Sequence, residues 1–179
     1  FDSPLGESTG AAAIFGATGG VMEAALRTAA EWLTGSDAAP VDFVEVRGVE
    51  GVKEATYQVG DLTLNVAVAS GLANAKKLLD AVKSGEKTYH FIEIMGCPGG
   101  CVNGGGQPVQ PARIRNWVDL KSLRAAALYQ EDKDLPVRKS HDNPTLQLIY
   151  KEFLKTPGSH VAHQVLHTSY RKRDRFTAK

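Results

Sequence analysis

One short segment, residues 94–108, constrains the chain more than any other. It holds both cysteines of the protein, Cys97 and Cys101, and six of its fifteen residues are glycine. Glycine lets a backbone turn tightly and approach a bulky group closely. Two thiols in such a loop point to an iron–sulfur cluster, which normally takes four protein ligands. The chain offers two cysteines, so we interpret the loop as one part of a metal site.

The alternatives for the two cysteines are weaker. Pro98, Gly99 and Gly100 separate them, and these residue types are poor helix formers, which argues against a thiol pair on one helix face. A local disulfide is one alternative, and a structural zinc half-site is another, although no second cysteine pair completes four zinc ligands. Two buried cysteines beside a turn would not account for the glycines. Consecutive glycines present N–H groups to an anion, which favours the cluster.

Length and composition set broad limits. A chain of 179 residues with 42% hydrophobic residues fits one globular domain with an appended segment. A net charge of +1 gives no case for a nucleic-acid partner, and no apolar run is long enough for membrane insertion. Two cysteines do not make a disulfide scaffold, which favours a reducing compartment and a cytoplasmic location. The chain starts at Phe1 without a signal segment, so we expect a fragment or a processed chain.

The hydrophobic pattern predicts an α/β fold with a mixed sheet flanked by helices, followed by a mainly helical C-terminal segment. Strands are predicted over residues 11–15, 41–47, 55–59, 62–69 and 89–94. Helices are predicted over 21–33, from a cap at Ser70 to about Val82, over 117–130, and from 144 to Leu154. We divide the chain into residues 1–111 and 112–179. The strand over 89–94 delivers the cysteine loop.

Several strings resemble one known family. The string from Met95 to Pro108 is similar to the last of three cysteine motifs of the iron-only ([FeFe]) hydrogenases. Residues 15–27, 128–144 and 167–170 resemble the same family, so the resemblance covers nearly the whole chain. Cytosolic iron–sulfur assembly factors share a similar cysteine loop, but the string over 18–23 favours the true hydrogenases.

The resemblance implies a cofactor and a set of site residues. The family's H-cluster is a four-iron cubane joined to a two-iron unit with CO, CN⁻ and a bridging dithiolate. Cys97 matches a cubane ligand, and Cys101 matches the ligand that also bridges to the two-iron unit. Met95 falls near the two-iron unit, where a soft side chain packs against small ligands. Phe15 and Val21 fall in the apolar surround and gas route, with an ordinary core role as the alternative.

The chain also departs from the family pattern. The family's two earlier cysteine motifs carry the other two cubane ligands, a proton-relay cysteine and a lysine that contacts a cyanide, and neither motif occurs in these residues. The resemblance therefore implies a partner, which is an N-terminal hydrogenase portion or subunit. A ferredoxin or an NAD-linked electron-transfer module would also lie outside the chain. Residues 112–179 resemble the small subunit of secreted members, here in the fused, cytoplasmic arrangement.

The expected function is part of an iron-only hydrogenase, an oxidoreductase that reversibly reduces protons to hydrogen. We expect activity only in combination with the missing portion. The alternative is a non-catalytic iron–sulfur assembly or sensory relative that holds only a four-iron cluster.

Other polar residues receive structural interpretations. His160, His163 and His167 share a helical spacing, and we interpret them as packing or surface residues in preference to metal ligands. Glu93 is interpreted as surface or structural, and the basic run over 171–175 as a solvated tail.

Overall fold

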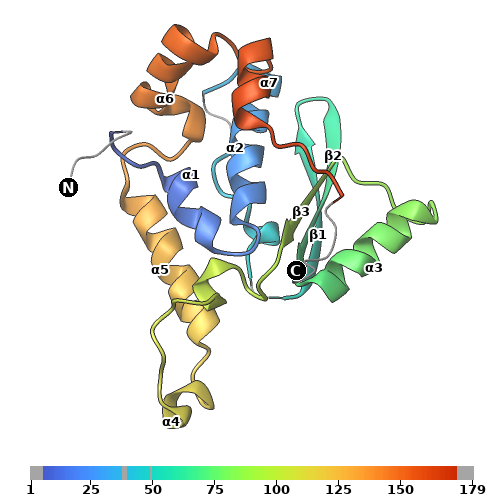
Figure 1. Ribbon diagram of the computed structural model, residues 1–179, viewed down its shortest axis with the longest axis vertical. Helices are drawn as coiled ribbons and strands as arrows, with labels where there is room; N and C mark the ends of the chain where they lie inside the picture. Colours follow the sequence, from blue (N-terminus) through green and yellow to red (C-terminus); the bar gives the residue numbers. More distant parts are fainter. Residues whose placement is uncertain (1–5, 38–39, 49, 173–179) are drawn as a thin grey trace, which may run out of the picture. The chain divides into compact units, whose positions relative to one another are not determined.

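The computed structural model describes residues 6–37, 40–48 and 50–172, which divide into two compact units. The first unit ends at Asn143 and the second begins at Pro144. The first unit is built around a three-stranded sheet with a helix against each face (Figure 1). Among the described residues, no helix is long and apolar enough to cross a membrane.

The sheet is mixed, as the sequence predicts. Its strands are β1 (Val52–Val59), β2 (Leu62–Ser70) and β3 (Phe91–Met95), in the order β1-β2-β3. β1 and β2 form an antiparallel hairpin around Gly60, whose φ of 59° is the left-handed conformation that glycine adopts without strain. β2 and β3 run parallel, so the chain needs a crossover between them. Helix α3 (Leu72–Lys83) provides it.

The two faces of β2 hold two separate cores. Successive strand residues point to opposite faces, so Val66 and Val68 face helix α2 (Gly20–Thr34), whereas Ala67 and Ala69 face α3. The core on the α2 side includes Met22, Leu26, Ala30, Phe43, Val46, Val59, Val66 and Val68. The core on the α3 side includes Ala67, Ala69, Ala75 and Leu78. Because β2 is covered on both sides, its central residues are buried.

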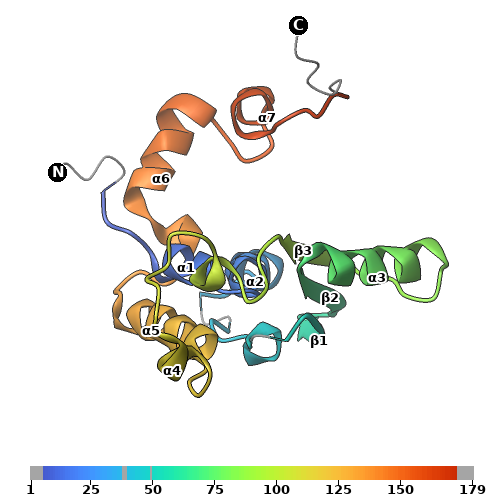
Figure 2. The same cartoon turned by 60° about the horizontal axis from the view of Figure 1, so that its bottom comes forward.

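Short helices and α5 complete the first unit. α1 (Gly10–Ala13) lies beside α5 (Leu120–Asp134), as both views show (Figure 2). The remaining short elements are the 3₁₀ turns η1 (Ile14–Gly16), η2 (Val44–Val46), η3 (Cys101–Asn103) and η4 (Ser140–Asp142), and helix α4 (Ala112–Arg115).

The second unit is helical, as expected. Helix α6 (Pro144–Ile149) continues into a π-helical turn, η5 (Tyr150–Leu154), and ends where the sequence predicts. Helix α7 (His160–Leu166) follows, and Ser159 caps it by accepting a hydrogen bond from the N–H of Ala162 at 3.1 Å.

Two predicted strands are wrong. Residues 11–15 form α1 and η1, because Thr9 caps a helical turn by accepting a hydrogen bond from the N–H of Ala12 at 3.2 Å. Residues 41–47 contain η2, which begins just after Phe43, and the buried side chains of Phe43 and Val46 are three residues apart. A short apolar run does not distinguish a strand from a buried helical turn.

The predicted cap of α3 is also wrong. Ser70 is the last residue of β2, and Gly71 precedes the helix with a φ of 84°. Without a capping side chain, the chain turns from strand to helix through this glycine, which tolerates the conformation.

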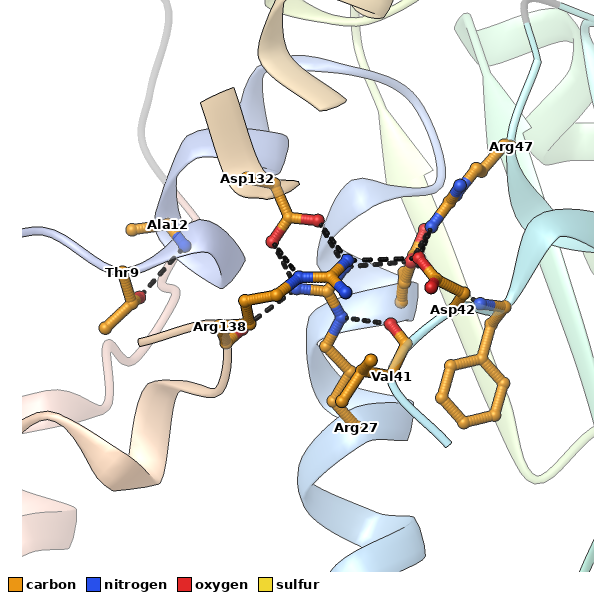
Figure 3. A network of polar contacts seen from close by, with 10 residues as sticks. Thr9, Ala12, Arg27, Val41, Asp42, Arg47, Asp132 and Arg138 are labelled. Carbon is orange, nitrogen blue, oxygen red and sulfur yellow. Dashed lines mark hydrogen bonds and ion pairs between the residues drawn. The ribbon is translucent and has the colours of Figure 1, made fainter. Parts of the chain in front are cut away.

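A buried network of charges joins α2 to α5 (Figure 3). Arg27 is fully buried and donates to Asp132 through both terminal nitrogens, at 2.7 and 2.8 Å. It also donates to Glu23 at 3.0 Å and to the carbonyl of Val41 at 2.6 Å. Arg138 makes a further bond to Asp132 at 2.6 Å. A buried charge is tolerated only when it is paired and hydrogen-bonded in this way.

We expect Arg27→Leu to lower the free energy of unfolding by about 3 kcal/mol, because removing one partner leaves buried charge less compensated. Lys76→Ala is the matched control. It removes an exposed pair with Asp80 on α3, and we expect it to cost less than about 0.5 kcal/mol. Urea unfolding of the three proteins measures both changes. Equal effects of the two substitutions would show that the network does not stabilise the fold.

Candidate functional site

The cysteine loop begins where β3 ends, at Met95. Cys97 and Cys101 are free thiols and both are exposed. The carbonyl of Cys97 accepts a hydrogen bond from the N–H of Gly100 at 3.0 Å, and the carbonyl of Cys101 accepts one from Gly104 at 2.9 Å. The two thiols therefore lie on a single turn-rich loop and are accessible to a ligand from outside.

The loop lies directly against the turn over residues 16–18. Gly100 has a φ of +96°, and a Cβ there would come within 2.7 Å of both the Gly16 oxygen and the Thr18 nitrogen. The N–H of Thr18 donates to the carbonyl of Gly99 at 3.1 Å. Glycine is thus required at position 100 for the backbones to touch. Two of the strings that carry the family resemblance, residues 15–27 and 95–108, meet here.

Glu93 holds the start of α2 in place from within β3. Its carboxylate is buried and accepts hydrogen bonds from the N–H groups of Gly19 and Met22, each at 2.7 Å. Negative charge is favourable at a helix N-terminus, where backbone N–H groups lack partners. The sequence predicts a surface or a structural role for Glu93, and the structure shows the structural one. The available signal was the single charge in the apolar run Phe91–Met95.

Lys53 holds the turn over 16–18, a role that its sequence position does not predict. Its buried ammonium donates to the carbonyls of Thr18 and Gly48, each at 2.9 Å. Burial lowers the pKa of Lys53 to about 8, while the negative charges of Glu93 and Glu50 act in the opposite direction. A lysine at the start of β1 gives no sequence signal for this contact, because its partners are backbone carbonyls.

Helix α5 holds the far side of the loop. Arg124 donates to the carbonyl of Val102 at 3.0 Å and to that of Pro108 at 2.9 Å. Within the loop, the side chain of Asn103 donates to the carbonyl of Pro98 at 3.0 Å. The loop is therefore anchored by contacts from three directions, namely β3, the turn over 16–18, and α5.

The other predicted site residues flank the same region. Met95 and Val21 are half-buried, and Phe15 is exposed on η1. Phe15 and Val21 lie just before and just after the turn that contacts the cysteine loop. The hydroxyl of Thr18 is buried within that turn and has no hydrogen-bond partner in the described part of the chain. An unsatisfied buried hydroxyl in a turn that touches the cysteine loop fits a site that takes a further group.

The two thiols do not form a complete metal site by themselves. Within the described residues, no third His, Cys, Asp or Glu joins them in a group of possible ligands. The one such group found there is Glu31, His141 and Asp142, and Lys139 already neutralises Glu31. The histidines of the second unit form no such group in the same ranges, although the rings of His163 and His167 lie 4.7 Å apart.

Comparison with known proteins places the chain in a family. Residues 1–105 match the family described as "Iron only hydrogenase large subunit, C-terminal domain", and residues 118–173 match "Iron hydrogenase small subunit". The chain belongs to the iron-only hydrogenase family, in which it matches the C-terminal part.

Curated relatives agree with the family. The chain is 54% identical over 176 residues to the NADP-reducing hydrogenase subunit HndD of Solidesulfovibrio fructosivorans, covering 98% of this chain and 29% of that protein. It is 46% identical over 171 residues to Iron hydrogenase 1 of Clostridium pasteurianum, covering 96% of this chain and 30% of that protein. The chain thus spans about a third or less of the length of these relatives.

A solved structure supports the α/β fold. A variant of the [FeFe]-hydrogenase HydA1 from Chlamydomonas reinhardtii is 40% identical in sequence, with a TM-score of 0.68. The match covers 95% of this chain and 48% of that one. About half of the solved chain therefore has no counterpart here.

We expect Gly100→Ala to lower the free energy of unfolding by about 2 kcal/mol, since it adds backbone strain and a clash with residues 16–18. Gly105→Ala is the control, because a Cβ there meets nothing within 4 Å. Its effect should stay within about 1 kcal/mol. Urea unfolding distinguishes the two, and a Gly100→Ala protein as stable as the control would contradict the close approach.

Lys53 should give the protein a characteristic pH dependence. Because burial lowers its pKa from 10.5 to about 8, the unfolded chain binds more protons than the folded chain between these values, and stability rises with pH across that window. Lys53→Met removes this contribution. The unfolding free energy of the wild type should therefore rise relative to that of the variant from pH 8 to pH 10. If the difference between the two free energies stays constant or shrinks, the ammonium of Lys53 does not titrate in a buried position.

Proposed function

We propose that this chain supplies two of the four cubane ligands of an H-cluster, as part of an iron-only hydrogenase that reversibly reduces protons to hydrogen. One observation carries the proposal. Two free, exposed thiols lie on a glycine loop that is fixed against a turn far away in sequence. The membership of the chain in the iron-only hydrogenase family supports it.

The residues present suit this cofactor. Cys97 would ligate the cubane, and Cys101 would ligate it and bridge to the two-iron unit. Met95 would pack beside the two-iron unit, and Phe15 and Val21 would form part of its apolar surround. Thiolates are the normal ligands of iron–sulfur clusters, and the glycine loop offers backbone N–H groups nearby. When bound, the H-cluster would relay electrons from an external donor and provide the site at which protons are reduced.

The chain's own contribution is to hold the two thiolates in place. Glu93, the turn over 16–18 and Arg124 fix the loop from different elements, so that ligand binding requires little reorganisation of its backbone. A site preorganised by surrounding packing binds its group at a lower entropic cost.

Activity requires polypeptide outside this chain. The other two cubane ligands and the proton relay would come from an N-terminal portion or subunit, and electrons from a ferredoxin or an NAD-linked module. The small share of the relatives' length that the chain covers supports this assignment. We assign residues 1–111 to the C-terminal lobe of the H-cluster domain and residues 112–179 to the small-subunit-like segment, in a cytoplasmic enzyme.

A specific observation favours a second candidate. The chain is 36% identical over 160 residues to Protein NAR1 of Arabidopsis thaliana and 32% identical over 155 residues to a cytosolic iron–sulfur assembly component of Bos taurus. A relative of that kind would hold a four-iron cluster without the two-iron unit. The higher identity to hydrogenases makes this the second choice.

We expect Cys101→Ser to abolish hydrogen evolution in the assembled enzyme, because serine is a poor substitute for a bridging thiolate. Cys97→Ser should lower the iron bound per chain, while Val109→Ser, a change at an exposed position just after the loop, should leave both unchanged. Hydrogen evolution and iron content are the measurements.

Infrared spectra separate the two candidate functions. The proposed hydrogenase should show bands of bound CO and CN⁻, which Cys101→Ser should remove. An assembled wild-type protein that binds a cubane but shows no such bands would favour the assembly relative. Unimpaired hydrogen evolution by Cys101→Ser would overturn the role of this residue.

A further inference from the structure

β3 is an edge strand that has no pairing strand on its outer side within the described ranges. At the end of β3, the carbonyl of Met95 accepts a hydrogen bond from the N–H of Gly71 at 2.7 Å, next to the end of β2. Backbone groups along a strand alternate in direction, so Glu93 also faces β2, and the N–H groups of Ile92 and Ile94 point toward the open edge. An uncovered edge of this kind is a template for another strand.

Apolar side chains flank this edge on both faces of the sheet. Phe91, on the α2 face, is 41% exposed, and Ile94, on the α3 face, is 44% exposed. On the α2 face a groove of about 330 Å³ adjoins the edge. Its lining is mainly apolar and includes Ala25, Ala29, Leu33, Leu64, His90 and Phe91. An added strand with apolar side chains on both faces would cover all of this surface at once.

The opposite edge of the sheet differs in character. β1 alternates buried or half-buried residues with the exposed polar residues Glu54, Thr56 and Gln58. Glu54 also pairs with Lys87 at 2.6 Å. Polar and charged side chains protect an edge strand from further pairing. The contrast identifies β3, and not β1, as the edge that is built to be covered.

We propose that the open edge of β3, together with the groove beside α2, receives an apolar extended strand from the hydrogenase polypeptide that lies outside this chain. The proposal rests on the proposed function. β3 leads directly into the cysteine loop, so polypeptide that brings two further ligands to Cys97 and Cys101 must come to this end of the sheet. The solved relative has about half of its chain available for this role, since the match covers 48% of it.

Hydrogen–deuterium exchange tests the added strand directly. The 179-residue chain is compared alone and after co-expression with the part of HndD that lies outside the matched region. The segment over 89–95 should gain protection, because the outward N–H groups of Ile92 and Ile94 acquire partners. The segment over 52–59 of β1 should not. No added protection at 89–95 in a purified complex would overturn the proposal.

Matched substitutions test the groove. Leu33 on α2 is 51% exposed and lines the groove, whereas Leu79 on α3 is 50% exposed and lies elsewhere. Leu33→Asp should lower the fraction of chain recovered with the HndD part at least fivefold, and Leu79→Asp should leave it within twofold. Equal losses would refute docking at the groove. If the chain alone sediments as a dimer in which 89–95 is protected, a second copy is the occupant and the proposal is wrong.

A cysteine-free variant separates this inference from the proposed function. The double variant Cys97→Ser, Cys101→Ser should still assemble with the HndD part and still protect 89–95, because the added strand needs no cluster. A wild-type complex that shows CO and CN⁻ bands but no protection at 89–95 would overturn the docking alone. A wild-type complex that is protected at 89–95 but shows no such bands supports the docking and counts against the hydrogenase assignment.

Discussion

The site depends on one buried carboxylate. Glu93 lies in the last strand before the cysteine loop and accepts hydrogen bonds from two backbone N–H groups at the start of α2. These groups are 74 and 71 residues away in sequence. The bond fixes the first turn of α2 against the strand that leads to Cys97. With α2 placed, the turn over 16–18 comes into contact with Gly100, and the loop backbone has little freedom left.

Two cationic side chains around the cysteine loop bind backbone carbonyls. Lys53 binds the carbonyl of Thr18, and Arg124 binds those of Val102 and Pro108. Cations that hold carbonyls fix the chain path without occupying the side chains that a cofactor would need. Both thiols accordingly remain free and exposed. Because the loop is held through its backbone carbonyls, the residues that could ligate or surround a cluster are not those that hold the loop.

The sequence predicted the parts of the fold that follow from local pattern. Alternation in β2 and the turn at Gly60 identified the hairpin, and the helical spacing over 21–33 identified α2. The runs over 11–15 and 41–47 were mistaken for strands because a short apolar segment carries no clear period. The unusual glycine content located the cysteine loop. The contacts of Lys53 with Thr18 and of Arg124 with Pro108, and the Arg27–Asp132 pair, could not be predicted, because each joins residues distant in sequence.

The pairing of Arg27 with Asp132 has a consequence for how the chain can be divided. Arg27 lies in the stretch that matches the large-subunit family, and Asp132 lies in the stretch that matches the small-subunit family. The connection between the two matches, residues 106–117, is largely exposed and includes the solvent-facing side chains Val109 and Trp117. The two stretches are therefore joined twice, once by the exposed covalent connection and once by buried charges that do not depend on it.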